Sequence, residues 1–191
     1  MPDPDQTRIQ AFEDASAFGQ WLALNHASES EVWVKMYKKG SGQKTINWEE
    51  GVIEALCWGW IDGIKKSFDD QAYLQRFTPR RPGSNWSKRN REHVKRLIAA
   101  GRMQEPGLVH VRAAQADGRW AAAYASSEMT VPEDFLAALE KRPAAKAFFE
   151  TLNKQNRYAI AYRLQTAKKP ETRQKRLEQF LDMLEKGEKL Y

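Results

Sequence analysis

The spacing of apolar residues changes along the chain, and it predicts where helices and strands lie. A helix is expected from about Asp14 or Ser16, because the apolar residues that follow recur at intervals of three and four. Residues 31–37 instead alternate apolar and polar side chains, which is typical of a strand. The same reasoning predicts a helix from Asn47 to about Trp60 or Ile61, a β-hairpin formed by residues 64–68 and 73–77, and a helix from Ser84 or Ser87 to Gly101.

Beyond Gly101 the helical spacing dominates. Residues 103–127 carry little periodicity, so a connector with one short element is expected there. Four helices should follow, over residues 130–139, 143–152, 157–166 and 170–187. The pattern predicts an α+β fold, with a small N-terminal antiparallel sheet and packed helices, followed by a helical C-terminal part. We expect an α+β domain over 1–102 that carries the candidate site, and a helical part over 103–191 packed on it as one continuous globular unit.

The composition is that of a soluble globular protein. Of 191 residues, 41% are hydrophobic and 29% are charged, and no run approaches the roughly 18 apolar residues that a membrane helix needs. The acidic N-terminus has no secretory signal pattern, so we expect a cytoplasmic protein without membrane insertion. The single cysteine, Cys57, excludes an intrachain disulfide and lies in an apolar run where thiols are usually inert.

Positive charge is concentrated in the middle of the chain. The net charge is +6, and the segment 80–119 alone holds ten basic residues and three acidic ones. Such a segment favours anionic partners, although a solvated helix face is the other interpretation. If the partner were a nucleic acid, Trp86 or Trp58 would stack on bases and four cations would contact phosphates. These are Lys88, Arg89, Lys95 and Arg96.

A second concentration, of tryptophan and short polar side chains, lies between Cys57 and Asn90. Indoles are costly to expose, so their mixture with arginines and an aspartate suggests a part-buried polar site for a small anionic ligand. The candidate residues are Trp58, Trp60, Asp62, Arg76, Arg80, Ser84, Trp86 and Asn90.

Each candidate residue also has a purely structural interpretation. Asp62 is suited to an ion pair with Arg76 or Arg80, or to a turn, as well as to ligand binding. Trp58 and Trp60 would point about 200 degrees apart on a helix, so one of them should line a pocket or an interface. An inward Arg76 would need a carboxylate or phosphate partner. Serine residues near 84–87 either cap a helix or help to hold an anion at its N-terminus.

Other chemistry has little support in the sequence. The three histidines are far apart and have no carboxylate at metal-ligand spacing. The chain has no phosphate-binding Walker loop, dinucleotide fingerprint or nucleophile elbow. We therefore assign no metal, no cofactor and no catalytic residue, and whether the protein is an enzyme stays open.

Several motifs resemble those of a known family. The runs ALCWGWIDG at 55–63, YLQRFTPR at 73–80 and SNWS at 84–87 resemble the hallmark of the YdeI/OmpD-associated proteins, which are labelled bacteriocin-protection proteins. The run AKKPETR at 167–173 resembles the family's tail, and the resemblance extends over about Phe12 to Gly187. It implies an α+β part followed by a helical part, and an association with antimicrobial-peptide resistance and an outer-membrane porin. It implies no catalytic mechanism.

Three hypotheses for function follow. The first is a cytoplasmic stress-response or antimicrobial-peptide and bacteriocin-resistance protein that binds a small anionic ligand or a protein partner. The alternatives are a nucleic-acid-binding module that uses segment 80–119, and an enzyme in which Asp62 is the base and arginines clamp an anionic metabolite. Direct porin contact is not expected without an export signal. A cationic protein also repels a cationic peptide, so any protection should be indirect.

Overall fold

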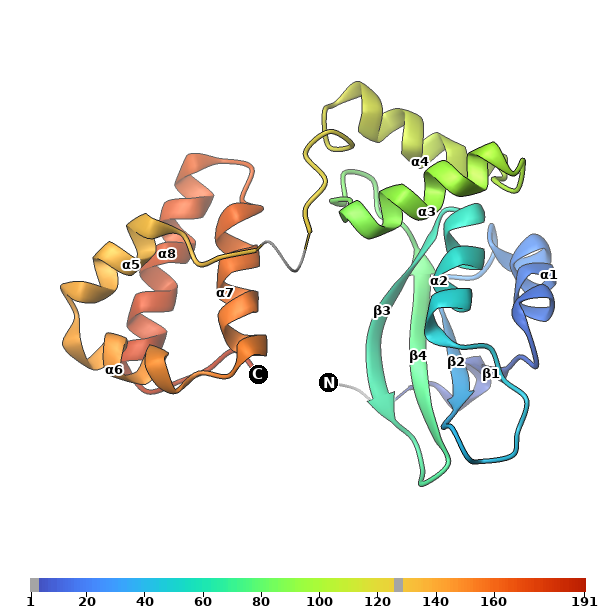
Figure 1. The fold of residues 1–191 in the computed structure, drawn as a ribbon, viewed down its shortest axis with the longest axis horizontal. Coiled ribbons are helices and arrows are strands. Elements are labelled where there is room, and N and C mark those ends of the chain that lie inside the picture. The colour runs from blue at the N-terminus through green and yellow to red at the C-terminus, as the bar shows by residue number, and fades with distance from the viewer. Residues whose placement is uncertain (1–3, 126–128) are drawn as a thin grey trace. The chain divides into compact units, whose positions relative to one another are not determined.

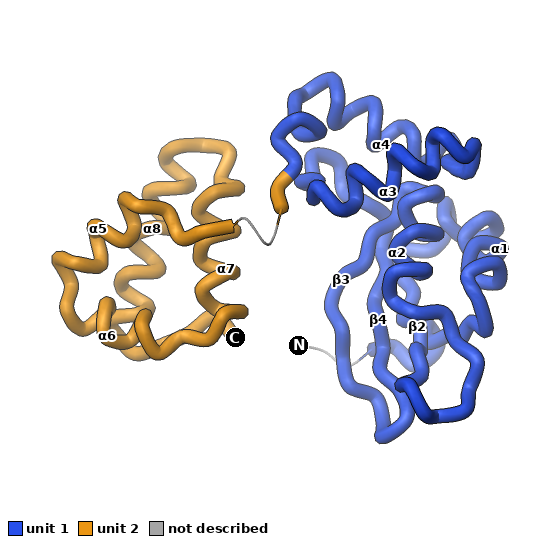
Figure 2. Tube along the Cα trace, viewed as in Figure 1, with its two compact units in different colours: residues 1–123 blue, residues 124–191 orange. Residues whose placement is uncertain are grey.

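The computed structural model describes residues 4–125 and 129–191, and it divides into two compact units, residues 1–123 and 124–191 (Figure 2). Residues 103–123, which the sequence assigned to the helical C-terminal part, belong to the first unit. The predicted packing of the C-terminal part on the rest of the chain stays a prediction.

The first unit is built on a four-stranded sheet in the order β1-β2-β4-β3 (Figure 1). Its strands are β1 (Ile9–Ala11), β2 (Val32–Tyr37), β3 (Trp60–Ser67) and β4 (Ala72–Pro79). β2, β4 and β3 pair antiparallel, which confirms the predicted sheet, whereas β1 pairs parallel to β2. The sequence missed β1 because three residues are too few to show an alternation.

Four α-helices complete the first unit, after a short 3-10 helix over Gln6–Arg8. They are α1 (Ala15–Asn25), α2 (Trp48–Cys57), α3 (Lys88–Ala99) and α4 (Glu105–Ala116). The N-termini of α1, α2 and α3 follow predicted polar caps, with Asp14 accepting from the Ala17 N–H and Asn47 forming a capping box with Glu50. Of the two serines considered for α3, the cap is Ser87.

Two predicted elements were wrong in extent. The helix expected to reach Trp60 or Ile61 ends at Cys57, because Gly59 has a left-handed φ of +74° and β3 begins at Trp60. The connector expected over 103–127 contains the twelve-residue helix α4, whose Pro106 and Gly107 weakened the helical pattern. Residues 126 and 127 of that connector lie outside the described residues.

The core of the first unit lies between the sheet and its helices. α1 and α2 cover one face of the sheet (Figure 1), where Phe18 and Leu22 pack with Val34 and Phe77. Side chains alternate along a strand, so the neighbouring positions Trp33 and Arg76 lie on the opposite face. α3 and α4 extend the same core with apolar side chains, including Val94 and Val111.

Within its described residues, the second unit contains four helices, as the sequence predicted. They are α5 (Glu133–Glu140), α6 (Pro143–Thr151), α7 (Lys154–Gln165) and α8 (Pro170–Glu185). Phe135, Ile160, Leu164 and Leu184 are fully buried in a separate apolar cluster. Among the described residues, no helix is both long enough and apolar enough to cross a membrane.

Because each unit has its own core, a core mutation in one unit should lower the unfolding free energy of that unit alone. Leu164→Ala should destabilise the second unit by about 2–5 kcal/mol, because the fully buried side chain leaves a cavity. All seven tryptophans lie between Trp21 and Trp120, so their fluorescence reports on the first unit alone. In urea titrations of the whole chain, the circular dichroism transition should move to lower urea while the fluorescence transition stays in place.

The matched control is Leu22→Ala, which removes the same side chain from the first core, where it is also fully buried. It should shift the fluorescence transition. Shifts of equal size in both probes for both variants would show that the chain unfolds as one cooperative unit.

Candidate functional site

The turn between α2 and β3 separates the two neighbouring tryptophans of the candidate site. Trp60 is 1% exposed, and its indole N–H donates to the His26 carbonyl at 3.2 Å. Trp58 is half-buried, with its ring centroid 4.8 Å from that of His26. It lines an open hollow of about 720 Å³ next to α1 and the α3–α4 loop. Trp60 is therefore part of the core, and Trp58 belongs to the surface.

Asp62 lies on the helix-covered face of β3. Its carboxylate accepts a hydrogen bond of 3.0 Å from the indole N–H of Trp48, on the first turn of α2. Burial raises the pKa of Asp62, and this effect outweighs the Trp48 hydrogen bond and the charges of Arg80 and Arg89, all of which lower it. Asp62 is thus a part-buried acid set close to two arginines.

Arg80 and Trp86 form a buried stack beside Asp62. Arg80 is 4% exposed and Trp86 is 2% exposed, and the guanidinium carbon lies 3.7 Å from the indole centroid. Arg80 also donates to the Asn85 carbonyl, and Trp86 meets Trp120 edge-on at 5.0 Å. This arrangement fixes the loop between β4 and α3 against the core.

Arg89, on α3, also contacts the residues around Asp62. Its guanidinium stacks on Trp48 at 4.7 Å and pairs with Glu49 at 3.2 Å, yet its side chain stays 53% exposed. We define the Asp62 cluster as the residues joined by these contacts. They are Trp48, Asp62, Arg80, Trp86 and Arg89.

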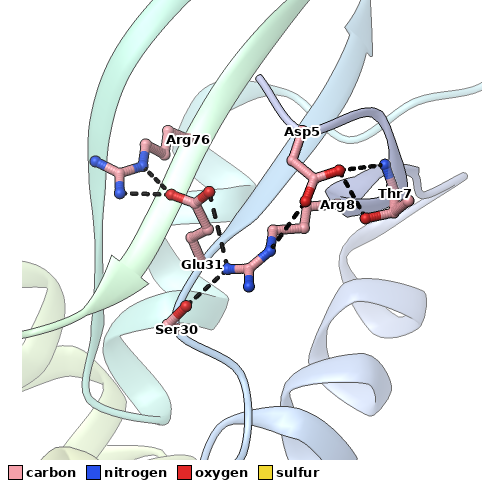
Figure 3. Close-up of polar contacts among 6 residues, drawn as sticks. All are labelled: Asp5, Thr7, Arg8, Ser30, Glu31 and Arg76. Carbon is pink, nitrogen blue, oxygen red and sulfur yellow. Dashed lines mark hydrogen bonds and ion pairs between the residues drawn. The ribbon is translucent and has the colours of Figure 1, made fainter. Parts of the chain in front are cut away.

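Arg76 does not join the Asp62 cluster. Asp62 is in register with Phe77, so the adjacent Arg76 lies on the other face of the sheet. There its guanidinium pairs with Glu31 at 2.5 Å, and Glu31 also lies 3.8 Å from Arg8 (Figure 3). Arg8 in turn donates to Ser30 and pairs with Asp5 (Figure 3). The carboxylate partner of Arg76 is Glu31. Of the two arginines considered for an ion pair with Asp62, Arg76 is therefore excluded, because it lies on the other face of the sheet.

Ser84 and Asn90 have backbone roles. The Ser84 hydroxyl donates to the Arg81 carbonyl at 2.9 Å, and its own carbonyl accepts from Arg119 at 2.7 Å. The backbone N–H of Asn90 donates to the Ser87 hydroxyl. Because that capping bond occupies an N–H group at the start of α3, the structure favours capping over anion binding at this helix end.

The cations of α3 considered for nucleic-acid contact have partners within the chain. Arg89 pairs with Glu49, and Lys95 pairs with Glu92 at 3.0 Å. Arg96 lies 2.8 Å from the ring Nδ1 of the buried His93. Lys88, at the start of the helix, also makes an interaction within the chain. These contacts neutralise part of the charge that the sequence alone suggested.

Arginine charges also act on two histidines near the Asp62 cluster. Burial lowers the pKa of His93, and Arg96 and Arg89 lower it further, although Glu49 acts in the opposite direction. Burial also lowers the pKa of His110, followed by the charges of Arg80 and Arg119. Each histidine therefore lies near at least one arginine of the cluster, which disfavours its protonated form.

Sequence reasoning missed two residues of this site, Trp48 and Glu49. Both directly follow the Asn47 cap, so the first turn of a predicted helix was the available signal. Across the described ranges 4–125 and 129–191, no three His, Cys, Asp or Glu side chains gather as a metal-binding group. Burial raises the pKa of the Cys57 thiol to about 11, which makes it a poor nucleophile.

Comparison with protein families divides the chain in two. The chain belongs to the family described as Domain of unknown function (DUF8412), whose model matches residues 10–110. Residues 128–187 match the family described as Bacteriocin-protection, YdeI or OmpD-Associated, which confirms the resemblance and connects the chain with that group in general. The tail motif at 167–173 lies in this second match, whereas the tryptophan motifs lie in the first. No curated protein and no solved structure matches the chain.

Replacing Asp62 should change how stability depends on pH. The raised pKa means that the folded protein binds this proton more tightly than the unfolded chain, so Asp62 lowers stability as the pH rises above its ordinary value of 3.8. Asp62→Asn should therefore be at least as stable as the parent protein at about pH 7, and lose that advantage near about pH 3.5. Urea midpoints across this range measure the difference.

Asp69→Asn provides a control of opposite sign. Burial alone would raise the pKa of Asp69, but the hydrogen bonds from the Gln71 and Ala72 N–H groups and the charge of Lys35 together outweigh it and lower the pKa. That variant should be less stable than the parent at neutral pH, with a deficit that shrinks as the pH falls. If the stability of Asp62→Asn relative to the parent increased toward low pH, the raised pKa of Asp62 would be contradicted.

Proposed function

We propose that this protein supports bacteriocin protection by binding an acidic protein partner at the exposed side of the Asp62 cluster. The observation that carries the proposal is the exposed guanidinium of Arg89, which lies over the Trp48 ring beside a part-buried carboxylate. Stacked arginine and tryptophan side chains are typical of residues that dominate the energy of protein interfaces. The match of residues 128–187 supplies the link to bacteriocin protection.

A protein partner fits this surface better than a small molecule does. Small ligands usually bind in concave pockets that bury most of their surface. The hollow beside Trp58 and a larger one near residues 38–47 are lined by residues outside the Asp62 cluster. A cluster with an exposed arginine over an aromatic ring is better suited to a complementary protein surface.

The electrostatics favour a partner with exposed carboxylates. Arg80 and Arg89 belong to the Asp62 cluster, and beside burial, which is the main cause, the charge of Arg89 lowers the pKa of His93 and that of Arg80 lowers the pKa of His110. A cationic bacteriocin would be repelled within about 8–10 Å at physiological salt, so protection would act through the acidic partner rather than by trapping the peptide. Nucleic-acid binding is the less favoured alternative because two of its candidate cations have partners on their own helix, Lys95 with Glu92 and Arg96 with His93.

Reversal of one charge tests the proposal. Cells that express the protein should survive bacteriocin challenge better than cells with an empty vector. Arg89→Glu should abolish that advantage, because it removes the stacked guanidinium and adds repulsion toward an acidic partner. Equal amounts of folded protein must be present in every strain.

Lys95→Glu is the matched control, since Lys95 is an exposed cation of the same helix that pairs with Glu92. It should retain protection. A parent protein without protective effect, or equal losses in both variants, would contradict the proposal. The proposal also places the protein in the cytoplasm and in the stress response. Fractionation of the same cells tests the compartment, and the amount of protein before and after exposure to the peptide tests the stress response.

A further inference from the structure

The first unit has a second polar region at the end of the sheet opposite α3 and α4. The loop between β2 and α2 and the tip of the β3–β4 hairpin both lie there (Figure 1). The loop and the adjoining ends of β3 and β4 line an open hollow of about 880 Å³, within the size range of small-molecule sites. The Asp62 cluster lies near the start of β3, whereas this hollow is reached by Lys65 and Ser67 at the end of the same strand.

The charges around this hollow have one sign. Its charged lining residues are Lys38, Lys39 and Lys65, and its remaining lining is uncharged at neutral pH. Hydroxyl groups of Ser41 and Ser67 are also in the lining, and both can donate hydrogen bonds. A hollow with several cations, hydroxyl donors and no carboxylate in its lining selects for anions.

Neutral groups orient two of the three lysines. The Lys38 ammonium donates to the main-chain carbonyls of Asp69 and Asp70 at 3.0 and 3.2 Å. The Lys65 ammonium lies 3.8 Å from the ring centroid of Tyr73. A carbonyl or an aromatic face positions an ammonium group without cancelling its charge. The two lysines are thus held in place with their charge available to a ligand.

The nearby carboxylate of Asp69 is directed elsewhere. It accepts from the N–H groups of Gln71 and Ala72 at 2.8 and 2.6 Å, and lies 3.5 Å from Lys35. These contacts close the hairpin turn rather than neutralise the lysines that line the hollow. The loop on the other side is open, since nothing lies within 4 Å of the Cβ positions of Gly40 and Gly42.

We propose that this hollow binds an organic phosphate of up to nucleotide size, with its phosphate groups between Lys38, Lys39 and Lys65. Lysine acts as a compact point charge toward phosphate, and several lysines around one hollow suit a polyphosphate better than a single carboxylate. The site is separate from the Asp62 cluster and does not depend on the function proposed for it.

Titration of the isotope-labelled whole chain with ATP, AMP and inorganic phosphate tests the site by NMR. The amide signals of Gly40 and Gly42 should shift and saturate with up to about 5 mM ATP, a range that detects dissociation constants near 1 mM. ATP should bind more tightly than AMP because it carries more phosphate charge. Inorganic phosphate should give the weakest shifts, because it lacks the base and sugar that the rest of the hollow would contact.

Lysine variants identify the contacts. Lys39→Gln and Lys65→Gln should each weaken ATP binding about tenfold, which corresponds to the loss of one charge-assisted contact. Lys39 is exposed on the loop, so its replacement should leave the fold intact even if the Lys65 variant does not. Lys95→Gln, on α3, should bind ATP like the parent protein.

The proposal would be overturned if the two glycines showed no saturable shift, if the shifts centred on α3, or if Lys95→Gln weakened binding as much as Lys39→Gln. Arg89→Glu separates this site from the proposed function, because that variant should lose protection and keep ATP binding. Inorganic phosphate binding as tightly as ATP would overturn the assignment to an organic phosphate.

Discussion

At Gly59 the backbone adopts a φ of +74°, and α4 passes so close that a Cβ atom there would lie 2.7 Å from the Pro106 carbonyl oxygen. Much of the first unit depends on this close approach. It ends α2, turns Trp60 into the core and leaves Trp58 at the surface. The Gly59 carbonyl also accepts from the Arg80 N–H at 2.8 Å, which ties the end of β4 to the same turn.

Because of this turn, several tryptophan and arginine side chains of the sequence motifs stabilise the fold instead of facing a ligand. Trp60, Arg80 and Trp86 are buried and hold together the junction between the sheet and α3. What remains accessible is the side of the junction where Arg89 lies on Trp48. The proposed interface is therefore supported by a rigid core, which keeps the cost of ordering side chains on binding low.

Local patterns in the sequence were sufficient for the hairpin and for every α-helix of the described residues except α4. The Asn47 and Glu50 pair predicted a capping box, and the alternation over 31–37 predicted β2. The candidate site was harder, because its contacts join distant residues such as Glu31 with Arg76 and Trp48 with Asp62. The register shift in β3 between Asp62 and Lys65 also hides which side chains share a face. Sequence spacing alone therefore placed Arg76 and Asp62 together although the sheet separates them.

The measurement that tests this account most directly compares Gly59→Ala with Gly118→Ala. Both glycines have a left-handed φ, but nothing lies within 4 Å of the Cβ position of Gly118, whereas that of Gly59 meets Pro106 and His110. Both variants should lose about 1 kcal/mol for the backbone, and Gly59→Ala about 1–3 kcal/mol more, with a changed near-ultraviolet circular dichroism of the tryptophans. Equal losses in urea unfolding and an unchanged spectrum would contradict the claim that this close approach organises the unit.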